Sequence, residues 1–323
     1  MVASRALIRD LEQLLAADIS KCVPMGDGPR IGTCRLLLSD GRAAFVKTLH
    51  RAAAAGCHAD VPQARGGGPA GTDQSADPSA AGQFGAEARG LRWLAEAGAV
   101  PVARLLASAS WAVVTEWLPP EPASETAAER FGRGLARLHA AGAEGFGSPW
   151  PGFIAGLTLG DARADSWPEW YAAERLVPFA RLAASRGTLT ASDLALVEAA
   201  AQQAGALAGP PEPPSRIHGD CWSGNVVWSR GGGVLVDPAA QGGHRETDLA
   251  MLALFGTPFL ARILAGYQEV APLAPGWRER VALHQLHPLL VHACLFGTFY
   301  LHSVLDAARS VLAAAKAIGP PAS

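Results

Sequence analysis

Three side chains in the C-terminal half of the chain have the types and spacing that phosphoryl transfer requires. The stretch HGDCWSGN at 218–225 contains Asp220 and Asn225, and Asp237 follows at the end of an apolar run. Such chemistry uses a carboxylate that receives the acceptor proton, together with oxygen ligands that hold Mg²⁺ on ATP. We therefore expect Asp220 to be the catalytic base and Asn225 and Asp237 to be the magnesium ligands. This set is typical of a small-molecule kinase.

A simpler interpretation is a turn before a hairpin, with Asn225 capping the next strand. Any one of these residues alone would favour that interpretation, but their combined spacing favours the kinase. The apolar runs 226–228 and 234–236 flank a Gly-rich turn and predict a hairpin, which would bring Asn225 and Asp237 to one edge. Asp248, in a predicted helix at 245–255, either braces the catalytic loop through backbone N–H groups or is a simple helix-start carboxylate.

The N-terminal part predicts a nucleotide-binding lobe. The runs 34–38 and 43–47 flank an Asp-Gly turn and predict a hairpin that ends at Lys47. A helical stripe starts at Phe84 and places Glu87 beside it, so we expect a Lys47–Glu87 ion pair that orders phosphates. The alternatives are a solvated lysine and an exposed first-turn glutamate. Residues 25–32 resemble a glycine-rich phosphate loop only weakly.

A hinge is predicted where the strand at 111–115 ends. Backbone groups of Glu116, Trp117 and Leu118 would contact the adenine edge. We place the N-terminal lobe at 1–117 and the C-terminal lobe at 118–323, with a low-complexity, mobile insertion at 51–83. Further helices are expected at about 124–142, 167–186 and 190–207. The pattern indicates an α+β fold with a small N-terminal lobe, built from an antiparallel sheet plus one helix, and a larger, mostly helical lobe.

Composition narrows the remaining possibilities. The 323 residues are 49% hydrophobic and carry a net charge of −2, which favours neither a nucleic-acid partner nor an anionic membrane. Five cysteines without a C-x-x-C pair indicate reduced thiols in a cytoplasmic protein, and charged residues among the first leucines argue against a signal peptide. Residues 281–305 lack Asp, Glu, Lys and Arg, but their histidines favour a buried core helix pair over a membrane span. We do not expect His284 and His287 to hold a metal.

The chain resembles the fructosamine kinases, also called ketosamine 3-kinases, within the protein-kinase-like and aminoglycoside-phosphotransferase-like group. The resemblance covers nearly the whole chain. It rests on these segments: FVK at 45–47, EARGLRWL at 87–94, the helix at 167–176, HGDCWSGN at 218–225, VDPA at 236–239, GHRETDLAM at 243–251, LFG at 254–256 and HQLHPLLVHACLFG at 284–297. The Trp after the catalytic Asp and the Asp-Pro-Ala sequence distinguish this family from generic aminoglycoside or choline kinases.

The resemblance implies a bilobal, protein-kinase-like fold and ATP-dependent phosphorylation of the 3-hydroxyl of a ketosamine, either free or on a protein lysine. It assigns Asp220, Asn225, Asp237, Lys47 and Glu87 the roles given above, and it adds Trp222 and His292 as sugar-contacting residues. Three features depart from the family pattern: the poorly fitting glycine-rich region, Thr257 where a second Gly is usual, and the insertion after Lys47.

Three rival interpretations stay open at this point. The first is a kinase of the same fold that acts on an aminoglycoside, an amino alcohol or another amino-sugar. The second is an inactive kinase-like binding module, although every expected catalytic residue is present. The third is a hydrolase with Asp220 and Asp237 as paired carboxylates, which would leave Asn225 and Lys47 without a role. The sequence does not predict an oligomeric state.

Overall fold

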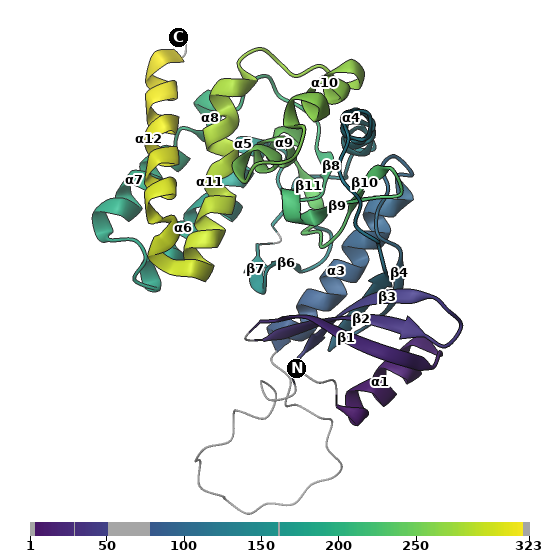
Figure 1. The fold of residues 1–323 in the computed structure, drawn as a ribbon. Coiled ribbons are helices and arrows are strands. Elements are labelled where there is room, and N and C mark those ends of the chain that lie inside the picture. Colours follow the sequence, from purple (N-terminus) through teal and green to yellow (C-terminus); the bar gives the residue numbers. More distant parts are fainter. Residues whose placement is uncertain (1–3, 29, 51–77, 161, 319–323) are drawn as a thin grey trace, which may run out of the picture. The chain divides into compact units, whose positions relative to one another are not determined.

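The computed structural model describes residues 4–28, 30–50, 78–160 and 162–318 (Figure 1). Its elements, in chain order, are α1 (Arg5–Leu15), β1 (Ile19–Asp27), β2 (Ile31–Leu38), β3 (Ala43–Leu49), α3 (Pro78–Glu96), β4 (Leu105–Ala109), β5 (Ala112–Glu116), α4 (Glu125–Ala140), β6 (Gly152–Ile154), β7 (Leu157–Leu159), α5 (Trp167–Tyr171), η1 (Ala172–Leu176), α6 (Val177–Ser185), α7 (Ala191–Ala201), α8 (Ala204–Leu207), β8 (Ser215–Ile217), η2 (Ser223–Asn225), β9 (Val226–Ser229), β10 (Gly232–Leu235), β11 (Gln241–Gly243), α9 (Arg245–Leu254), α10 (Leu260–Val270), α11 (Trp277–Phe296), η3 (Gly297–Tyr300) and α12 (Leu301–Ile318).

These elements form two compact units. Unit 1 comprises the described parts of Met1–Arg89, with Ala103–Leu118 and Ala155–Leu157. Unit 2 comprises Gly90–Val102, Pro119–Ile154 and the described parts of Thr158–Ser323. The stretch 90–102, which the sequence-based division assigns to the N-terminal lobe, groups with unit 2, because Val102 bridges to Leu235 and the Leu235 amide donates to the Pro101 carbonyl (2.9 Å).

Unit 1 is built on a five-stranded antiparallel sheet in the order β1-β2-β3-β5-β4. Its hairpin β2–β3 confirms the predicted pairing across the Asp-Gly turn, and the amphipathic helix α1 begins at Arg5, after its cap Ser4. Alternate residues of β2 and β3 are buried and pack with Leu11 of α1. The outer strands β1 and β4 were not predicted.

Helix α3 begins earlier than expected. The apolar stripe predicted a start at Phe84, but the helix begins at Pro78. Residues 78–83 include two alanines, the best helix former, and proline suits the first helical position. The predicted insertion at 51–83 is therefore wrong for its last residues, whereas the prediction for 51–77 lies outside the described part of the chain.

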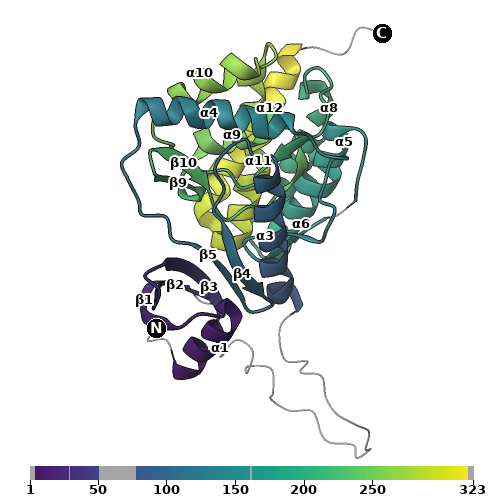
Figure 2. The same cartoon turned by 90° about the vertical axis from the view of Figure 1, so that its right-hand side faces the viewer.

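Unit 2 is mostly helical, as predicted. Helix α4 begins after Ser124, whose Oγ accepts the Ala127 amide, and α7 begins after Thr190 in a capping box with Asp193. The helix expected at 167–186 is α5 and α6 joined by the π-helical turn η1. One core cluster joins α4, α10 and α9 with the hairpin β9–β10, and these elements lie together in both views (Figures 1 and 2).

Two short strand pairs hold the segment between α8 and α9. β9 pairs with β10 across the two-residue turn Arg230-Gly231, in which both residues have positive φ, as a type I′ turn requires. This confirms the second predicted hairpin. β8, just before the segment HGDCWSGN, pairs with β11, and this pairing was not predicted. The pair β8–β11 therefore holds the chain just before this segment, and the pair β9–β10 holds it just after.

The apolar C-terminal stretch forms two helices. By length and composition alone, Trp277–Ile318 could cross a membrane, and 44% of its most apolar window is buried within the fold. The stretch is interrupted by η3, which joins α11 to α12 (Figure 1). Leu283, Leu286 and Leu290 of α11 are fully buried, as in the core helix of a folded domain.

Candidate active site

The segment HGDCWSGN at 218–225 brings Asp220 and Asn225 into direct contact. The Asn225 amide nitrogen Nδ2 donates to the Asp220 carboxylate Oδ2 and to its backbone carbonyl, both at 2.9 Å. Asn225 closes the turn η2, where its backbone N–H donates to the Trp222 carbonyl (2.9 Å). With Nδ2 committed to Asp220, the amide oxygen Oδ1 is the atom that Asn225 can offer to a cation.

Asp237 lies at the same end of the hairpin as Asn225. The Val236 amide donates to the Asn225 carbonyl (3.0 Å), and Nδ2 of Asn225 lies 3.5 Å from the Asp237 carbonyl. Asp237 itself has φ of 53°, in the left-handed region. This region is uncommon for a residue other than glycine, although Asp tolerates it better than most. The hairpin thus gathers Asn225 and Asp237 at one edge, as the sequence predicts.

Gly219 is the residue that allows the loop to turn. It has φ of 79°, and a Cβ there would lie 2.2 Å from the Ala239 carbonyl oxygen. Both the conformation and the contact exclude a side chain. The chain on either side of Asp220 can therefore pass directly against the segment that follows Asp237.

Asp248 braces the catalytic loop. Its carboxylate is fully buried and accepts hydrogen bonds from the backbone N–H groups of His218 (2.7 Å) and Gly219 (3.0 Å). Burial alone would raise the pKa of this carboxyl, but the hydrogen bond from His139 and the neighbouring charges lower it overall. Of the two interpretations of Asp248, the structure supports the brace.

His139 is a member of this network that the sequence did not reveal. Its Nε2 lies 3.1 Å from Asp248 Oδ2 and its Nδ1 lies 2.8 Å from the Tyr267 hydroxyl. A series of hydrogen bonds therefore runs from Tyr267 through His139 to Asp248 and ends on the backbone N–H groups of His218 and Gly219. These contacts span more than a hundred residues, so no local pattern could have predicted them.

His218 ties the loop to the strand end that leads to Asp237. Its Nδ1 accepts the Asp220 amide N–H (3.2 Å), and its Nε2 donates to the Val236 carbonyl (2.8 Å). Burial lowers the pKa of this imidazole, which favours the neutral form that makes one acceptor and one donor bond.

In unit 1, Lys47 and Glu87 form the predicted ion pair. Lys47 Nζ lies 2.6 Å from Glu87 Oε1, and the two side chains are only 12% and 7% exposed. Lys47 comes from β3 and Glu87 from α3. The alternatives of a solvated lysine and an exposed glutamate are wrong.

The predicted hinge residues end β5. The Trp117 amide donates to the Ala43 carbonyl (3.1 Å), and the Glu116 carboxylate accepts the Arg104 amide (3.1 Å). Leu118 is buried, and the Arg35 guanidinium lies over the Trp117 ring at 4.7 Å. The sheet therefore uses the Trp117 N–H, and contact of Glu116, Trp117 and Leu118 with adenine stays a prediction.

Trp222 and His292 belong to one group of aromatic rings in unit 2. The Trp222 ring lies edge-on to Phe255 with centroids 5.8 Å apart, and Phe255 lies 4.9 Å from His292. His292 Nδ1 donates to the Pro288 carbonyl (2.7 Å), so in the neutral ring Nε2 is a hydrogen-bond acceptor. The sequence did not single out Phe255, which joins these two residues.

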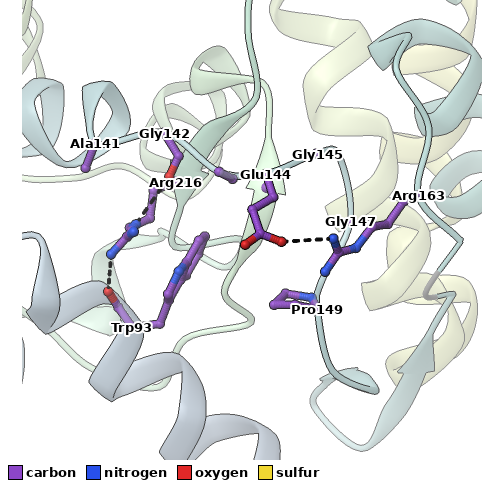
Figure 3. A pocket seen from close by; sticks show the side chains of 11 residues that line it. Trp93, Ala141, Gly142, Glu144, Gly145, Gly147, Pro149, Arg163 and Arg216 are labelled. Atoms are coloured by element: carbon purple, nitrogen blue, oxygen red, sulfur yellow. Dashed lines mark hydrogen bonds and ion pairs between the residues drawn. The ribbon is translucent and has the colours of Figure 1, made fainter.

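A separate cavity of about 390 Å³ opens in unit 2 beside Trp93 (Figure 3). Arg216 lines the cavity and donates to the Trp93 carbonyl (2.6 Å) and the Gly142 carbonyl (3.3 Å). Arg163, which also lines it, forms an ion pair with Glu144 (3.2 Å). None of the candidate site residues lines this cavity.

A buried group, His244, Glu246 and His284, could hold a metal by its donor types. The sequence placed no carboxylate near His284, but Glu246 reaches it from α9 (3.5 Å). The Arg280 guanidinium donates to both Glu246 oxygens, at 2.6 and 2.9 Å. The negative charge of Glu246 is therefore already neutralised by Arg280, so these three residues fit a metal ion poorly.

Comparison with known proteins identifies the family. The fructosamine kinase family model matches residues 74–314. A "probable ketoamine kinase" of Synechocystis sp. is 36% identical over 224 residues, which is 67% of this chain and 74% of that protein.

Solved structures agree with this assignment. The crystal structure of a "putative fructosamine-3-kinase" from Thermobifida fusca YX-ER1 is 43% identical with a TM-score of 0.83, covering 96% of this chain and 99% of that one. An ADP-bound aminoglycoside phosphotransferase, 13% identical over 95% of this chain and 99% of its own, has a TM-score of 0.59 and shares the fold alone. These likenesses confirm the predicted α+β, protein-kinase-like fold. The chain therefore belongs to the fructosamine kinase family, whose members are phosphotransferases that act on hydroxyl groups.

Proposed function

We propose that this enzyme uses ATP and Mg²⁺ to phosphorylate the 3-hydroxyl of a ketosamine, a fructosamine or ribulosamine that is either free or attached to a protein lysine. The observation that carries the proposal is the contact between Asn225 and Asp220, with Asp237 at the same hairpin end. The candidate base thus contacts one candidate metal ligand, and this ligand approaches the backbone of the second, which supports a shared role. Free thiols at the described cysteines suit the cytoplasmic location that we also propose.

In this proposal, Asp220 receives the proton of the acceptor hydroxyl. Its Oδ2 is oriented by Asn225, and its backbone is held by His218 and the Asp248 brace. The acceptor oxygen forms a bond to the γ-phosphorus while the bond from that phosphorus to the β–γ bridging oxygen breaks, and ADP leaves. The protein contributes chiefly position and charge complementarity.

The donor set of this loop fits magnesium. Asn225 would offer an amide oxygen and Asp237 a carboxylate, both hard oxygen ligands, and a few waters would complete the shell. When bound, the ion would screen the charge of the transferred phosphoryl group.

Unit 1 would hold the nucleotide. The Lys47 ammonium, fixed by Glu87 at 2.6 Å, is suited to pair with phosphate oxygens, and backbone groups at Glu116–Leu118 would receive the adenine. Trp222 and His292 would contact the sugar, Trp222 by stacking and His292 through the acceptor Nε2. These two residues belong to the same aromatic group, which supports a shared role.

A substrate panel tests the proposal directly. Purified enzyme with Mg-ATP would be given ketosamines, free sugars, choline and aminoglycosides, with ADP release as the rate and ³¹P NMR of the product as the assignment. We expect turnover of ketosamines with phosphate on O3. Turnover of only the non-ketosamines, or phosphate on another hydroxyl, would reject the proposed substrate while the phosphotransferase assignment stands.

A further inference from the structure

The rings around Trp222 continue well beyond the two sugar-contacting candidates. Phe255 links Trp222 to His292, the His292 ring lies 4.8 Å from Tyr300, and Tyr300 lies 5.2 Å from Phe299. Phe296 joins from α11, with its centroid 5.6 Å from His292 and 5.9 Å from Tyr300. We call these residues the aromatic array: Trp222, Phe255, His292, Phe296, Phe299 and Tyr300.

The inner end of the array is fixed next to the catalytic residue. Trp222 lies two positions after Asp220. Its ring lies so close to Gly224 that a Cβ there would meet the ring atoms at 2.4 to 2.8 Å. The Gly224 backbone on one side and Phe255 on the other therefore hold the indole in place. A group bound against this ring is bound beside the reacting hydroxyl.

The outer end of the array is open to solvent. Phe296 is 60% exposed and Phe299 is 83% exposed, where α11 ends and η3 turns the chain into α12 (Figure 1). Large aromatic side chains normally lose most of their exposure on folding. Neighbouring exposed rings that continue from a site indicate a binding surface more strongly than scattered ones do.

The stretch that carries these rings is itself low in charge. It contains no Asp, Glu, Lys or Arg from Val281 to Leu305, and the Arg186 guanidinium, which donates to the Cys294 carbonyl (2.7 Å), approaches the end of α11 from the end of α6. Such a surface binds apolar and aromatic groups by area and by ring contacts.

We propose that Phe296, Phe299 and Tyr300 form an outer acceptor subsite, which binds an aromatic or apolar group carried on the amine nitrogen of the substrate. The inference rests on the proposed function, because it supposes that the sugar lies on the inner rings beside Asp220. A ketosamine has two parts, and the array has two ends. With the sugar at the inner end, the amine substituent extends along the rings to the exposed end.

The test compares two ketosamines of fructose, one made with benzylamine and one made with glycine. kcat/KM is measured for both with wild type, with Phe296→Ser/Phe299→Ser, and with Phe259→Ser. The last variant is the matched control, because Phe259 is an exposed phenylalanine (41%) in the turn before α10. We expect wild type to prefer the benzylamine compound, the double variant to lose on the order of tenfold of that preference, and Phe259→Ser to keep it.

The rate with the glycine compound reports whether the double variant is intact. We expect this rate to stay near that of wild type, because glycine carries no aromatic or apolar group for the subsite. The ratio of kcat/KM for the benzylamine compound to kcat/KM for the glycine compound is the decisive quantity. If the double variant keeps the wild-type ratio, or loses activity equally with both compounds, the subsite is overturned while the proposed function stands. A change in sedimentation without a change in ratio would make the surface an interface between copies instead. If wild type phosphorylates neither compound, the subsite falls, whereas the proposed function falls only if the substrate panel also shows no turnover of any ketosamine.

Discussion

At the scale of single residues, the site is organised by Asn225. It is the only asparagine in the chain, and it uses its amide nitrogen, its backbone N–H and its carbonyl to join Asp220, Trp222 and Val236. One side chain therefore orients the candidate base and also offers a candidate metal ligand.

We predict that Asn225→Ala lowers kcat/KM by roughly 10- to 100-fold, because the Asp220 carboxylate loses a hydrogen bond worth about 1.5–3 kcal/mol. The variant should also need more Mg²⁺ for half-maximal rate, as an ADP-release titration would show. Gln268→Ala is the matched control, since this amide donates to the Leu264 carbonyl on α10 and lies outside the catalytic loop. Equal rates and equal Mg²⁺ dependence in wild type and Asn225→Ala would refute both roles.

The local geometry around these residues was largely predictable. Asp-Gly and Gly-rich turns between apolar runs predicted both hairpins, and a helical stripe next to a strand lysine predicted the Lys47–Glu87 pair. The glycine at position 219 is required by the structure, because only glycine fits the contact with the Ala239 carbonyl. The roles of Asp220, Asn225 and Asp237 stay predictions until they are tested by mutation.

At the scale of elements, helices hold the catalytic loop from behind. Asp248 from α9 accepts two loop N–H groups, and His139 from α4 supports Asp248. The sequence indicated Asp248 only as one of two possibilities and missed His139, Tyr267, β11 and α10. Such contacts join residues far apart in the chain, so spacing rules that work within one hairpin carry no information about them.

Replacing Asp248 should therefore affect both folding and catalysis. We predict that Asp248→Ala lowers the free energy of unfolding by about 3–5 kcal/mol, because the buried His218 N–H, the partly buried Gly219 N–H and the His139 ring all lose their acceptor. Urea unfolding would measure this loss. Glu125→Gln is the control, since Glu125 is also a first-turn helix carboxylate but is exposed, and its loss should cost less than about 1 kcal/mol.

The milder Asp248→Asn separates the two effects. It should keep enough stability to remain folded while lowering kcat more than it raises KM, since the amide replaces only one of the two acceptor oxygens. A variant with unchanged kcat would show that the brace serves stability alone.

At the scale of the whole molecule, buried histidines make stability depend on pH. Burial lowers the pKa of His218, His244, His284 and His287 in the folded state. The unfolded chain binds protons at these groups below about pH 6.5, whereas the folded chain does not until lower pH. Stability is therefore fully present above this value and is lost as the pH falls through it.

We predict that the Tm is nearly constant from pH 8 to pH 7 and falls steadily below about pH 6.5, with each buried histidine contributing up to roughly 1.4 kcal/mol per pH unit. Calorimetry in buffers of matched ionic strength measures the trend. His302→Gln is a control that should leave the profile unchanged, because His302 is exposed. A flat Tm between pH 7 and pH 5.5 would contradict the neutral, buried state of these imidazoles.

The role of Asp220 as catalytic base is tested most directly by measuring both kcat and the affinity for Mg-ATP of the variant Asp220→Asn. Asparagine keeps the shape of the side chain but cannot take the proton of the acceptor hydroxyl. We expect kcat with a ketosamine to fall by about 10² to 10⁴, while calorimetric binding of Mg-ATP stays close to wild type. An Asp220→Asn enzyme that turns over at a wild-type rate would contradict the account at its centre.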